Sequence, residues 1–364
     1  MTEGLEDVVA AQTVLSDVDG AAGQLVIRGY PLARLAGSWT FEAVLGLLFD
    51  GFFPELPGEA ALGRELGAAR AQVHARLEAH LPDLAALGPY DGLRAGIAML
   101  PDGTALEDAL RLVAGPAVIL PAIVRLRRGE DAIGPDAALP HAADMARMLA
   151  GASEPARAEA LQTYLVTVCD HGLNASTFAA RVVASTGAGL TSAALAGLCA
   201  LKGPLHGGAP GPVIEMLDAI TAHGAAHGDA REWLAALVRS GGRIMGFGHR
   251  IYRVRDPRAD ALKAALRKLA GGRDSPRLAF AEEVERMALA VLAELKPHRT
   301  LQTNVEFYTA LLLEEVGFPP EAFTGVFAAG RIGGWIAHAR EQALTGRLIR
   351  PRSHYVGPRA ELAA

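Results

Sequence analysis

The chain has 364 residues, of which 51% are hydrophobic and 21% are charged, so it can bury a large core and is unlike a disordered polypeptide. This length predicts two domains, or one large domain with an added lobe. The net charge of −5 argues against non-specific nucleic-acid binding as the main role. Small anions remain possible ligands, because local arginines can bind them.

The cysteines, the N-terminal residues and the length of the most apolar stretch exclude further classes of protein. The two cysteines, Cys169 and Cys199, form no CxxC pair or Cys/His cluster, which excludes a disulfide scaffold and a structural zinc site. Residues 1–11 are acidic and lack the basic and apolar regions of a secretory signal. The most apolar stretch, residues 187–201, is too short to span a bilayer. We therefore expect a soluble cytoplasmic protein with no membrane or nucleic-acid partner.

Most of the chain predicts helices, because apolar residues recur at helical spacing and β-branched runs are few. Near the N-terminus, residues 17–20 predict a turn and residues 24–28 a short strand, which together indicate a small hairpin. Thr40 is typical of a helix cap. The helices expected after it span 59–80, 91–100, 104–113, 116–127, 139–150, 156–170, 174–187, 189–202, 210–222, 229–239, 257–270, 278–295, 305–316 and 330–344.

Two of these helices, at 174–187 and 189–202, are rich in alanine, serine and glycine. Helices with such faces pack closely on other helices. Composition alone leaves two uses open, a subunit interface and an intramolecular core. The segment between Pro116 and Pro121 is expected to be interrupted, since proline removes a helical hydrogen bond.

Three glycine-flanked polar clusters stand out, at residues 203–208, 246–250 and 304–308. Glycines beside His206 and His249 allow unusual backbone angles and let a ligand approach the main chain. A histidine at a helix start is favoured in its neutral form and can donate a hydrogen bond without carrying charge. One such histidine alone would be interpreted as a turn or cap residue. Two such histidines, followed by Glu306, indicate a site with several acid/base residues.

Glu306 lies in an apolar run and is a candidate general base, although a solvent-facing helix position would be the ordinary interpretation. Arg258, Arg331 and Arg350 are held next to proline or glycine, which suits bidentate carboxylate binding, although most arginines are simply surface charges. His223 and His227 have i, i+4 spacing but lack the glutamate of a zinc-protease helix. The sequence contains no Walker A, GxGxxG or GxSxG motif, so nucleotide-phosphate and serine-hydrolase sites are unsupported.

A series of ordered motifs runs over nearly the whole chain: Ser16-Asp17-Val18-Asp19-Gly20, Arg28-Gly29-Tyr30, Asp170-His171-Gly172-Leu173-Asn174-Ala175-Ser176-Thr177, Lys202-Gly203-Pro204-Leu205-His206-Gly207-Gly208-Ala209, Met245-Gly246-Phe247-Gly248-His249-Arg250-Ile251-Tyr252, Asp256-Pro257-Arg258-Ala259, Asn304-Val305-Glu306-Phe307-Tyr308, Gly334-Trp335-Ile336-Ala337-His338 and Arg350-Pro351-Arg352. In these motifs the chain resembles the citrate synthase family, which includes 2-methylcitrate synthases.

This resemblance implies a mainly α-helical, two-domain fold with a small N-terminal β-hairpin, assembled as a homodimer. A large domain would comprise residues 1–208 and 314–364, and a small domain, which binds CoA and closes over the cleft, residues 209–313. The small-residue helices at 174–202 would then lie at the dimer interface.

The implied reaction is condensation of acetyl-CoA with oxaloacetate, followed by hydrolysis of citryl-CoA. Glu306 would remove a proton from the acetyl methyl group, His206 would stabilise the enol or enolate, and His249 would donate to the oxaloacetate ketone. The residues implied to hold oxaloacetate are His171, Arg258, Arg331 and Phe327, with Arg350 reaching the site of the neighbouring subunit. Those implied to bind CoA are Met245, Gly246, Phe247, Gly248 and Arg253. No metal and no permanently bound cofactor is implied.

Two positions depart from the family pattern. Glu306 stands where the family usually has aspartate, and its extra methylene displaces the carboxylate by roughly 1 Å or more. Val168 stands where many members have histidine. The first departure leaves the rate and the choice of acyl-CoA open.

Several functions therefore remain to be separated. Acetyl-CoA is the expected acyl donor. A 2-methylcitrate synthase that uses propionyl-CoA, or an enzyme with both activities, is the alternative, because one methylene in a pocket is worth only about 1–3 kcal/mol. A non-catalytic CoA- or dicarboxylate-binding paralogue is a second alternative, motivated by Glu306. A helical scaffold or metal-binding protein using His223 and His227 is a third.

Overall fold

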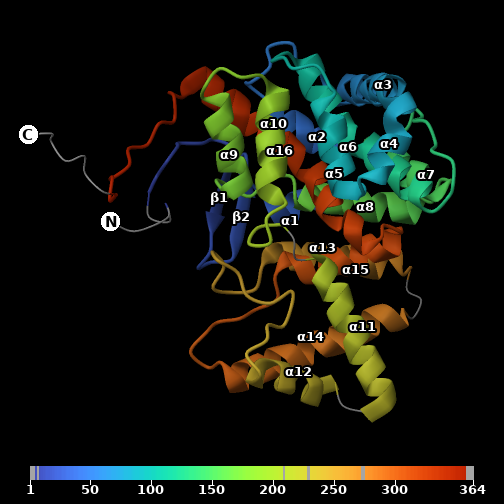
Figure 1. The fold of residues 1–364 in the computed structure, drawn as a ribbon, viewed down its shortest axis with the longest axis vertical. Helices are drawn as coiled ribbons and strands as arrows, with labels where there is room; N and C mark the ends of the chain where they lie inside the picture. Colours follow the sequence, from blue (N-terminus) through green and yellow to red (C-terminus); the bar gives the residue numbers. More distant parts are fainter. Residues whose placement is uncertain (1–4, 6–7, 208–209, 228–229, 272–274, 358–364) are drawn as a thin grey trace, which may run out of the picture.

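The computed structural model describes residues 5, 8–207, 210–227, 230–271 and 275–357. Over these residues the fold is mainly α, with one three-stranded sheet near the N-terminus (Figure 1). The expected fold class, helical with a small N-terminal hairpin, is confirmed.

The hairpin consists of β1 (Ser16–Asp19) and β2 (Gln24–Ile27), which pair antiparallel, and the short β3 (Tyr30–Pro31) extends the sheet on the far side of β2. The prediction that residues 17–20 form the turn is wrong, because residues 17–19 lie in β1 and the turn begins one residue after Asp19. The Asp19 carboxylate accepts hydrogen bonds from the backbone N–H groups of Ala21 and Ala22 at 2.9 and 2.8 Å. That side chain therefore closes the turn beyond the strand.

Most helices form one bundle, in the upper part of Figure 1. Two long helices run through its core, α6 (Leu106–Arg127) and α16 (Phe323–Thr345), and both bury nearly all of their apolar residues. The helices around them are α1 (Leu32–Leu35), α2 (Phe41–Phe49), α3 (Glu59–Leu77), α4 (Leu81–Ala86), α5 (Pro89–Ala98), α7 (His141–Ala150), α8 (Pro155–Thr167), α9 (Ala175–Ala184) and α10 (Leu190–Leu201).

A second group of helices lies below this bundle in Figure 1: α11 (Pro210–His227), α12 (Ala230–Arg239) and α14 (Pro276–Leu295). Between the two groups run α13 (Pro257–Leu269) and α15 (Val305–Val316), which pack against each other and against α8. The N-termini of α13 and α15 thus lie where the two groups of helices meet. The expected division into 1–208 with 314–364 and 209–313 stays a prediction.

The expected break between 104–113 and 116–127 is wrong, since α6 is continuous and carries both Pro116 and Pro121 inside it. Burial of this helix on nearly every side outweighs the lost hydrogen bonds. Among the described helices, α6 is also the one long and apolar enough to cross a membrane, but 83% of that window is buried inside the fold, as in the core helix of a soluble protein. The structure extends α11 to His227 and begins α16 at Phe323. It also adds α1 and α4, which the sequence analysis did not predict.

A buried ion pair joins α3 to α7. The Nε atom of Arg70 donates to the Asp144 carboxylate at 2.8 Å, and both side chains are fully buried. The same guanidinium donates to the carbonyl oxygens of Asp136 and Leu139, which lie in the loop before α7. Arg70 therefore holds that loop and the helix that follows it against α3.

Removing one partner of this pair leaves an uncompensated buried charge. We expect Asp144→Ala to lower the free energy of unfolding in urea by roughly 3–5 kcal/mol. Asp50→Ala is the matched control, since Asp50 pairs with Arg28 but its side chain is 74% exposed. That control should cost less than about 1 kcal/mol. Equal losses in the two variants would contradict the anchoring role of the buried pair.

Candidate active site

The candidate site lies where five segments of the chain meet: the link from α8 to α9, the loop before α13, the first turn of α15, the middle of α16 and the turn before α11. His171 belongs to the first segment, His249 and Tyr252 to the second. The His171 and His249 rings are 5.6 Å apart, and the Nε2 atom of His171 lies 3.1 Å from the Tyr252 hydroxyl. This aromatic cluster joins segments that are far apart in the sequence.

His249 has a defined hydrogen-bonding arrangement. Its Nδ1 atom accepts from the backbone N–H groups of Ile251 and Tyr252 at 3.0 and 3.1 Å. Burial, together with the nearby Arg258 cation, lowers the pKa of His249 to about 4. The ring is therefore neutral at physiological pH, and because Nδ1 accepts, its single hydrogen lies on Nε2. Nε2 lies 3.3 Å from Nη2 of Arg258, a group that cannot accept a hydrogen bond, so the Nε2 hydrogen stays available to a ligand bound beside Arg258.

Arg258 is fixed at the start of α13 by Asp256, the N-cap residue. Asp256 accepts from the backbone N–H and from the Nε and Nη2 atoms of Arg258, at 2.8–3.0 Å. The same carboxylate accepts from the backbone N–H of Val305 at 3.1 Å, at the start of α15. One buried carboxylate therefore sets the positions of Arg258 and of the residue next to Glu306.

Arg331 reaches the site from α16 and is almost completely buried. Its Nε atom donates to the Val168 carbonyl oxygen at 2.6 Å, and the guanidinium lies 4.8 Å from the centre of the Phe327 ring. Its Nη2 atom has no hydrogen-bond partner among the residues that the structure describes. Burial lowers the pKa of Arg331 to about 10. A buried cation with an unused donor is suited to bind a carboxylate ligand.

His206 lies in the turn before α11 and contacts Ser176 of α9. The backbone N–H of Ser176 donates to Nε2 of His206 at 3.3 Å, and the Ser176 hydroxyl oxygen lies 2.8 Å from the same nitrogen. Trp335 of α16 donates to that hydroxyl at 3.1 Å. Burial and the Arg331 cation lower the pKa of His206 to about 4. With Nε2 accepting, the neutral ring carries its hydrogen on Nδ1 and can donate from there.

Glu306 is the second residue of α15, and its backbone N–H donates to the N-cap residue Asn304 at 3.0 Å. Burial raises the pKa of Glu306 to about 7, although the Arg258 cation counteracts part of this shift. A carboxylate with a pKa near neutrality is a stronger proton acceptor than a solvated one. The same asparagine donates to the Gly248 carbonyl oxygen at 2.8 Å, which joins the start of α15 to the loop that carries His249.

That loop contains the residues expected to contact CoA. Gly246 and Gly248 both have positive φ, +82° and +85°, and a Cβ at Gly246 would lie 2.8 Å from the Phe307 side chain. Phe247 pairs with Thr303 in an isolated antiparallel bridge and packs edge-on against Phe307. The glycines therefore let the loop press closely onto α15. Met245 in this loop is half-buried, and Arg253 beyond His249 is exposed.

The structure brings six of the predicted residues together, with Phe327 beside Arg331: His171, His206, His249, Arg258, Glu306 and Arg331. It does not bring Arg350 to them. Arg350 is exposed in the segment after α16, whose neighbouring residue Ile349 donates to the Ser185 hydroxyl at the end of α9. That segment leaves the bundle beside α9 in Figure 1. Its predicted role requires a second subunit.

Sequence reasoning assigned no role to Ser176, Asp170, Tyr252 or His338, although each lies in a motif that it singled out. Tyr252 could have been found from its position three residues after His249. His338 and Asp170 are 168 positions apart yet in contact, and no local signal links them. Among the described residues, no three His, Cys, Asp or Glu side chains form a group that could hold a metal ion. The side chain of His227, named with His223 as a possible ligand pair, lies outside the described residues.

The site of this helical protein combines a buried arginine that has an unused donor, two neutral histidines, and a buried carboxyl group with a pKa of about 7. A family model described as "Citrate synthase, C-terminal domain" matches residues 4–352. The chain is 37% identical to the citrate synthase of Haloferax volcanii, over 98% of this chain and 96% of that protein. It is also 37% identical to a 2-methylcitrate synthase of Mycobacterium tuberculosis, over 98% of this chain and 90% of that protein.

Among solved structures, the chain resembles the citrate synthase of Thermoplasma acidophilum in ternary complex with carboxymethyl coenzyme A and oxaloacetate. The TM-score is 0.83 at 27% identity, over 99% of this chain and 97% of that chain. The protein belongs to the citrate synthase family, and its enzyme class is a citrate synthase-type transferase.

Proposed function

We propose that the protein condenses acetyl-CoA with oxaloacetate and hydrolyses the resulting citryl-CoA to citrate and CoA. The observation that carries this proposal is the buried Arg331 guanidinium with its unused Nη2 donor, set beside two neutral histidines and Glu306. A dicarboxylate supplies the missing anion, and the three other groups supply the proton transfers of a condensation at a carbonyl carbon.

Oxaloacetate would bind first among the cationic groups. Arg331 would donate Nη2 to one carboxylate, and Arg258 would donate to the other with the guanidinium atoms left free by Asp256. His171 would contact the substrate from the α8–α9 link, with Phe327 as an apolar wall. His249 would donate from Nε2 to the ketone oxygen. Because the ring is neutral, it polarises this ketone without adding to the repulsion between the two arginines.

The acyl-CoA would then be activated by Glu306 and His206. The Glu306 carboxylate would take a proton from the methyl group, while Nδ1–H of His206 donates to the thioester oxygen and stabilises the enol or enolate. The new carbanion carbon attacks the ketone carbon of oxaloacetate, and the resulting alkoxide takes the His249 proton. Hydrolysis of the thioester by water releases CoA and citrate.

The loop of Met245, Gly246, Phe247 and Gly248 would receive the adenine of CoA with its main chain, and the exposed Arg253 would approach the phosphates. Closure of the small domain, residues 209–313, would exclude water until condensation is complete. A cytoplasmic homodimer, joined through α9 and α10, is part of this proposal. Arg350 of one subunit would complete the oxaloacetate site of the other.

The first test is the release of free CoA thiol with oxaloacetate, measured in parallel with acetyl-CoA and propionyl-CoA. We expect turnover with acetyl-CoA at the higher kcat/KM. A higher kcat/KM with propionyl-CoA would make the protein a 2-methylcitrate synthase, the activity of one of its relatives. Oxaloacetate binding without turnover of either thioester would instead support a binding paralogue.

The acidic limb of the pH–rate profile should follow the ionisation of Glu306. Its carboxylate must be ionised to accept the methyl proton, so we expect kcat/KM for acetyl-CoA to rise with pH through about 7, the raised pKa of Glu306. His206 and His249, with pKa values of about 4, are already neutral over this range. If kcat/KM for acetyl-CoA does not change between about pH 5.5 and pH 8, the base role of Glu306 is contradicted.

Glu306→Gln should abolish condensation and leave the affinity for oxaloacetate nearly intact, because glutamine fills the same space but cannot accept the proton. A loss of at least about 100-fold in kcat is expected, measured by thiol release. Glu315→Gln, which changes an exposed carboxylate on the same helix, is the control and should keep wild-type activity. Substantial activity in Glu306→Gln would remove Glu306 from the base role.

Arg350→Ala should raise the KM for oxaloacetate by roughly tenfold, the loss of one charged hydrogen bond, without dissociating the dimer. Arg347→Ala, in the same exposed segment, is the control. Light scattering measures the oligomeric state of both variants. If the Arg350 variant dissociates while its remaining dimer keeps the wild-type kcat and KM, Arg350 is a structural residue of the dimer instead.

A further inference from the structure

The N-terminal hairpin carries a motif, residues 16–20, to which the proposed function assigns no role. Ser16 and Val18 are two residues apart on β1, so both side chains lie on one face of the strand. The Ser16 hydroxyl donates to the Asp170 carboxylate and accepts from the backbone N–H of Gly172 at 2.9 Å. A Cβ at Gly172 would lie 3.4 Å from Val18. This face of β1 therefore lies directly against the two neighbours of His171.

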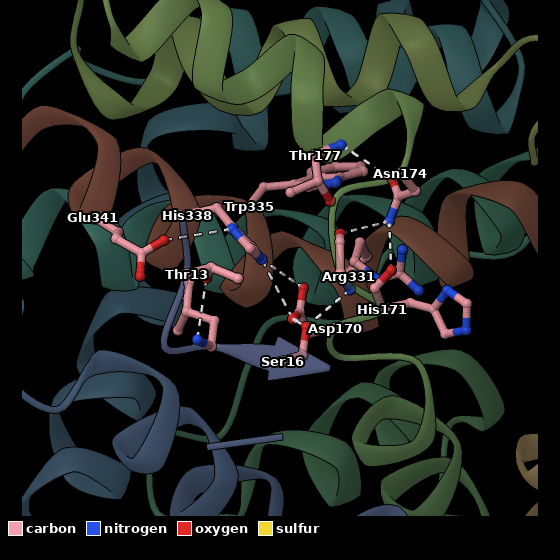
Figure 2. A network of polar contacts seen from close by, with 12 residues as sticks. Thr13, Ser16, Asp170, His171, Asn174, Thr177, Arg331, Trp335, His338 and Glu341 are labelled. Carbon is pink, nitrogen blue, oxygen red and sulfur yellow. Dashed lines mark hydrogen bonds and ion pairs between the residues drawn. The ribbon is translucent and has the colours of Figure 1, made fainter. Parts of the chain in front are cut away.

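Asp170 is held from its other side by α16. His338 lies with Nε2 3.2 Å from the Asp170 carboxylate and with Nδ1 2.9 Å from the Arg181 guanidinium. Since arginine can only donate, Nδ1 accepts and Nε2–H donates to Asp170. Figure 2 shows Ser16 and His338 both reaching this carboxylate, with Glu341 beyond His338. Glu341 in turn accepts from Arg181 and from the backbone N–H of Val14, just before β1.

The charge of Asp170 matters to the neighbouring arginine. Burial alone would raise the pKa of Asp170, but His338, Ser16 and Arg331 together outweigh burial and lower it. Asp170 is thus a buried anion that favours the charged form of Arg331. Arg331 and His171 are drawn next to each other in Figure 2. Loss of the Ser16 hydroxyl would remove one of the donors that fix this anion.

The turn of the hairpin reaches the other histidine. The Gly20 carbonyl oxygen accepts from the backbone N–H of Arg253 at 2.8 Å, and a Cβ at Gly20 would collide with the carbonyl group of Ile251. A Cβ at Gly23 would lie 2.6 Å from Val254. Ile251 is one of the two residues, with Tyr252, whose backbone N–H groups donate to Nδ1 of His249. The turn therefore packs closely against one of the residues that orient His249.

We propose that the N-terminal hairpin is a positioning element of the active site. Ser16 fixes the segment of His171 and the anion beside Arg331, and Gly20 fixes the loop of His249. One attachment point contacts the neighbours of His171, and the other contacts the loop that carries His249 and Tyr252. The strand between them therefore sets the distance between the two groups that hold and polarise one substrate. This inference rests on the proposed function, in which both histidines contact oxaloacetate.

Ser16→Ala tests the first attachment point. We expect the KM for oxaloacetate to rise roughly tenfold, as when a hydrogen bond to a charged group is lost. The kcat at saturating oxaloacetate should stay within about twofold of wild type, because the reacting groups remain in place. Ser16→Thr keeps a hydroxyl on a strand position and should restore the wild-type KM. Ser38→Ala, at an exposed serine of the same region, is the matched control and should leave the KM unchanged.

Gly20→Ala tests the second attachment point. The added methyl group displaces the Ile251 carbonyl, and with it the orientation of His249, so kcat should fall by about 10- to 100-fold. Gly58→Ala is the control, since a Cβ at Gly58 meets nothing within 4 Å. A circular dichroism melt of each variant shows whether the fold is retained.

The effects of the variants on KM and kcat, compared with their effects on the melting temperature, distinguish a positioning role from a structural role. Variants at Ser16 and Gly20 with lowered melting temperatures but wild-type KM and kcat would overturn the inference. If the wild type turns over neither thioester, the proposed function fails, and oxaloacetate binding by calorimetry becomes the measurement. Weaker binding in Ser16→Ala but not in Ser38→Ala would then support the positioning role. Equal affinities in the two variants, or no binding by the wild type, would overturn it.

Discussion

The carboxylate of Asp256 is the constraint on which the site depends. It caps α13, binds the Arg258 side chain and accepts from the first backbone N–H of α15. Two helix N-termini and one guanidinium therefore converge on a single buried anion, an arrangement in which several donors offset the cost of burying the charge. Because Arg258 is bound in this way, it approaches His249 from a fixed direction. Glu306, one residue after Val305, is fixed by the same anchor.

Arg331 presents the opposite situation. Asp256 fully occupies one side of Arg258, whereas Arg331 is buried with one carbonyl partner, an aromatic ring and a donor left unused among the described residues. Burying a cation in this way costs stability in the free protein, as its lowered pKa of about 10 indicates. A bound carboxylate offsets that cost. The protein thus holds a destabilising group at the proposed ligand site, and the anion of Asp170 favours the charged form of that group.

Local sequence signals predicted much of the fold. The bounds of α15 match residue for residue, because Asn304 caps the helix and Gly317, with φ of +109°, ends it. The continuity of α6 was missed, since the rule for proline is local whereas burial of the whole helix is a tertiary effect. The glycine- or proline-flanked histidines and arginines His206, His249, Arg258 and Arg331 were predicted from local signals, and the structure brings them together at the candidate site. Their supports could not be predicted, because Ser16 and Asp170 are 154 positions apart and only the folded chain places β1 against the α8–α9 link.

Glu306 differs from a solvated carboxylate in its basicity as well as from aspartate in its length. Burial at the start of α15 raises the pKa of Glu306 to about 7, so this carboxyl group changes its ionisation near neutral pH. In the proposed reaction, a proton acceptor whose pKa is raised from 4.5 to about 7 faces a smaller pKa difference from a carbon acid, which favours proton transfer. The displacement introduced by the extra methylene acts in the opposite direction. Asp256 accepts from the backbone N–H of Val305 and so anchors the backbone next to Glu306, which leaves the side chain itself to accommodate the extra methylene.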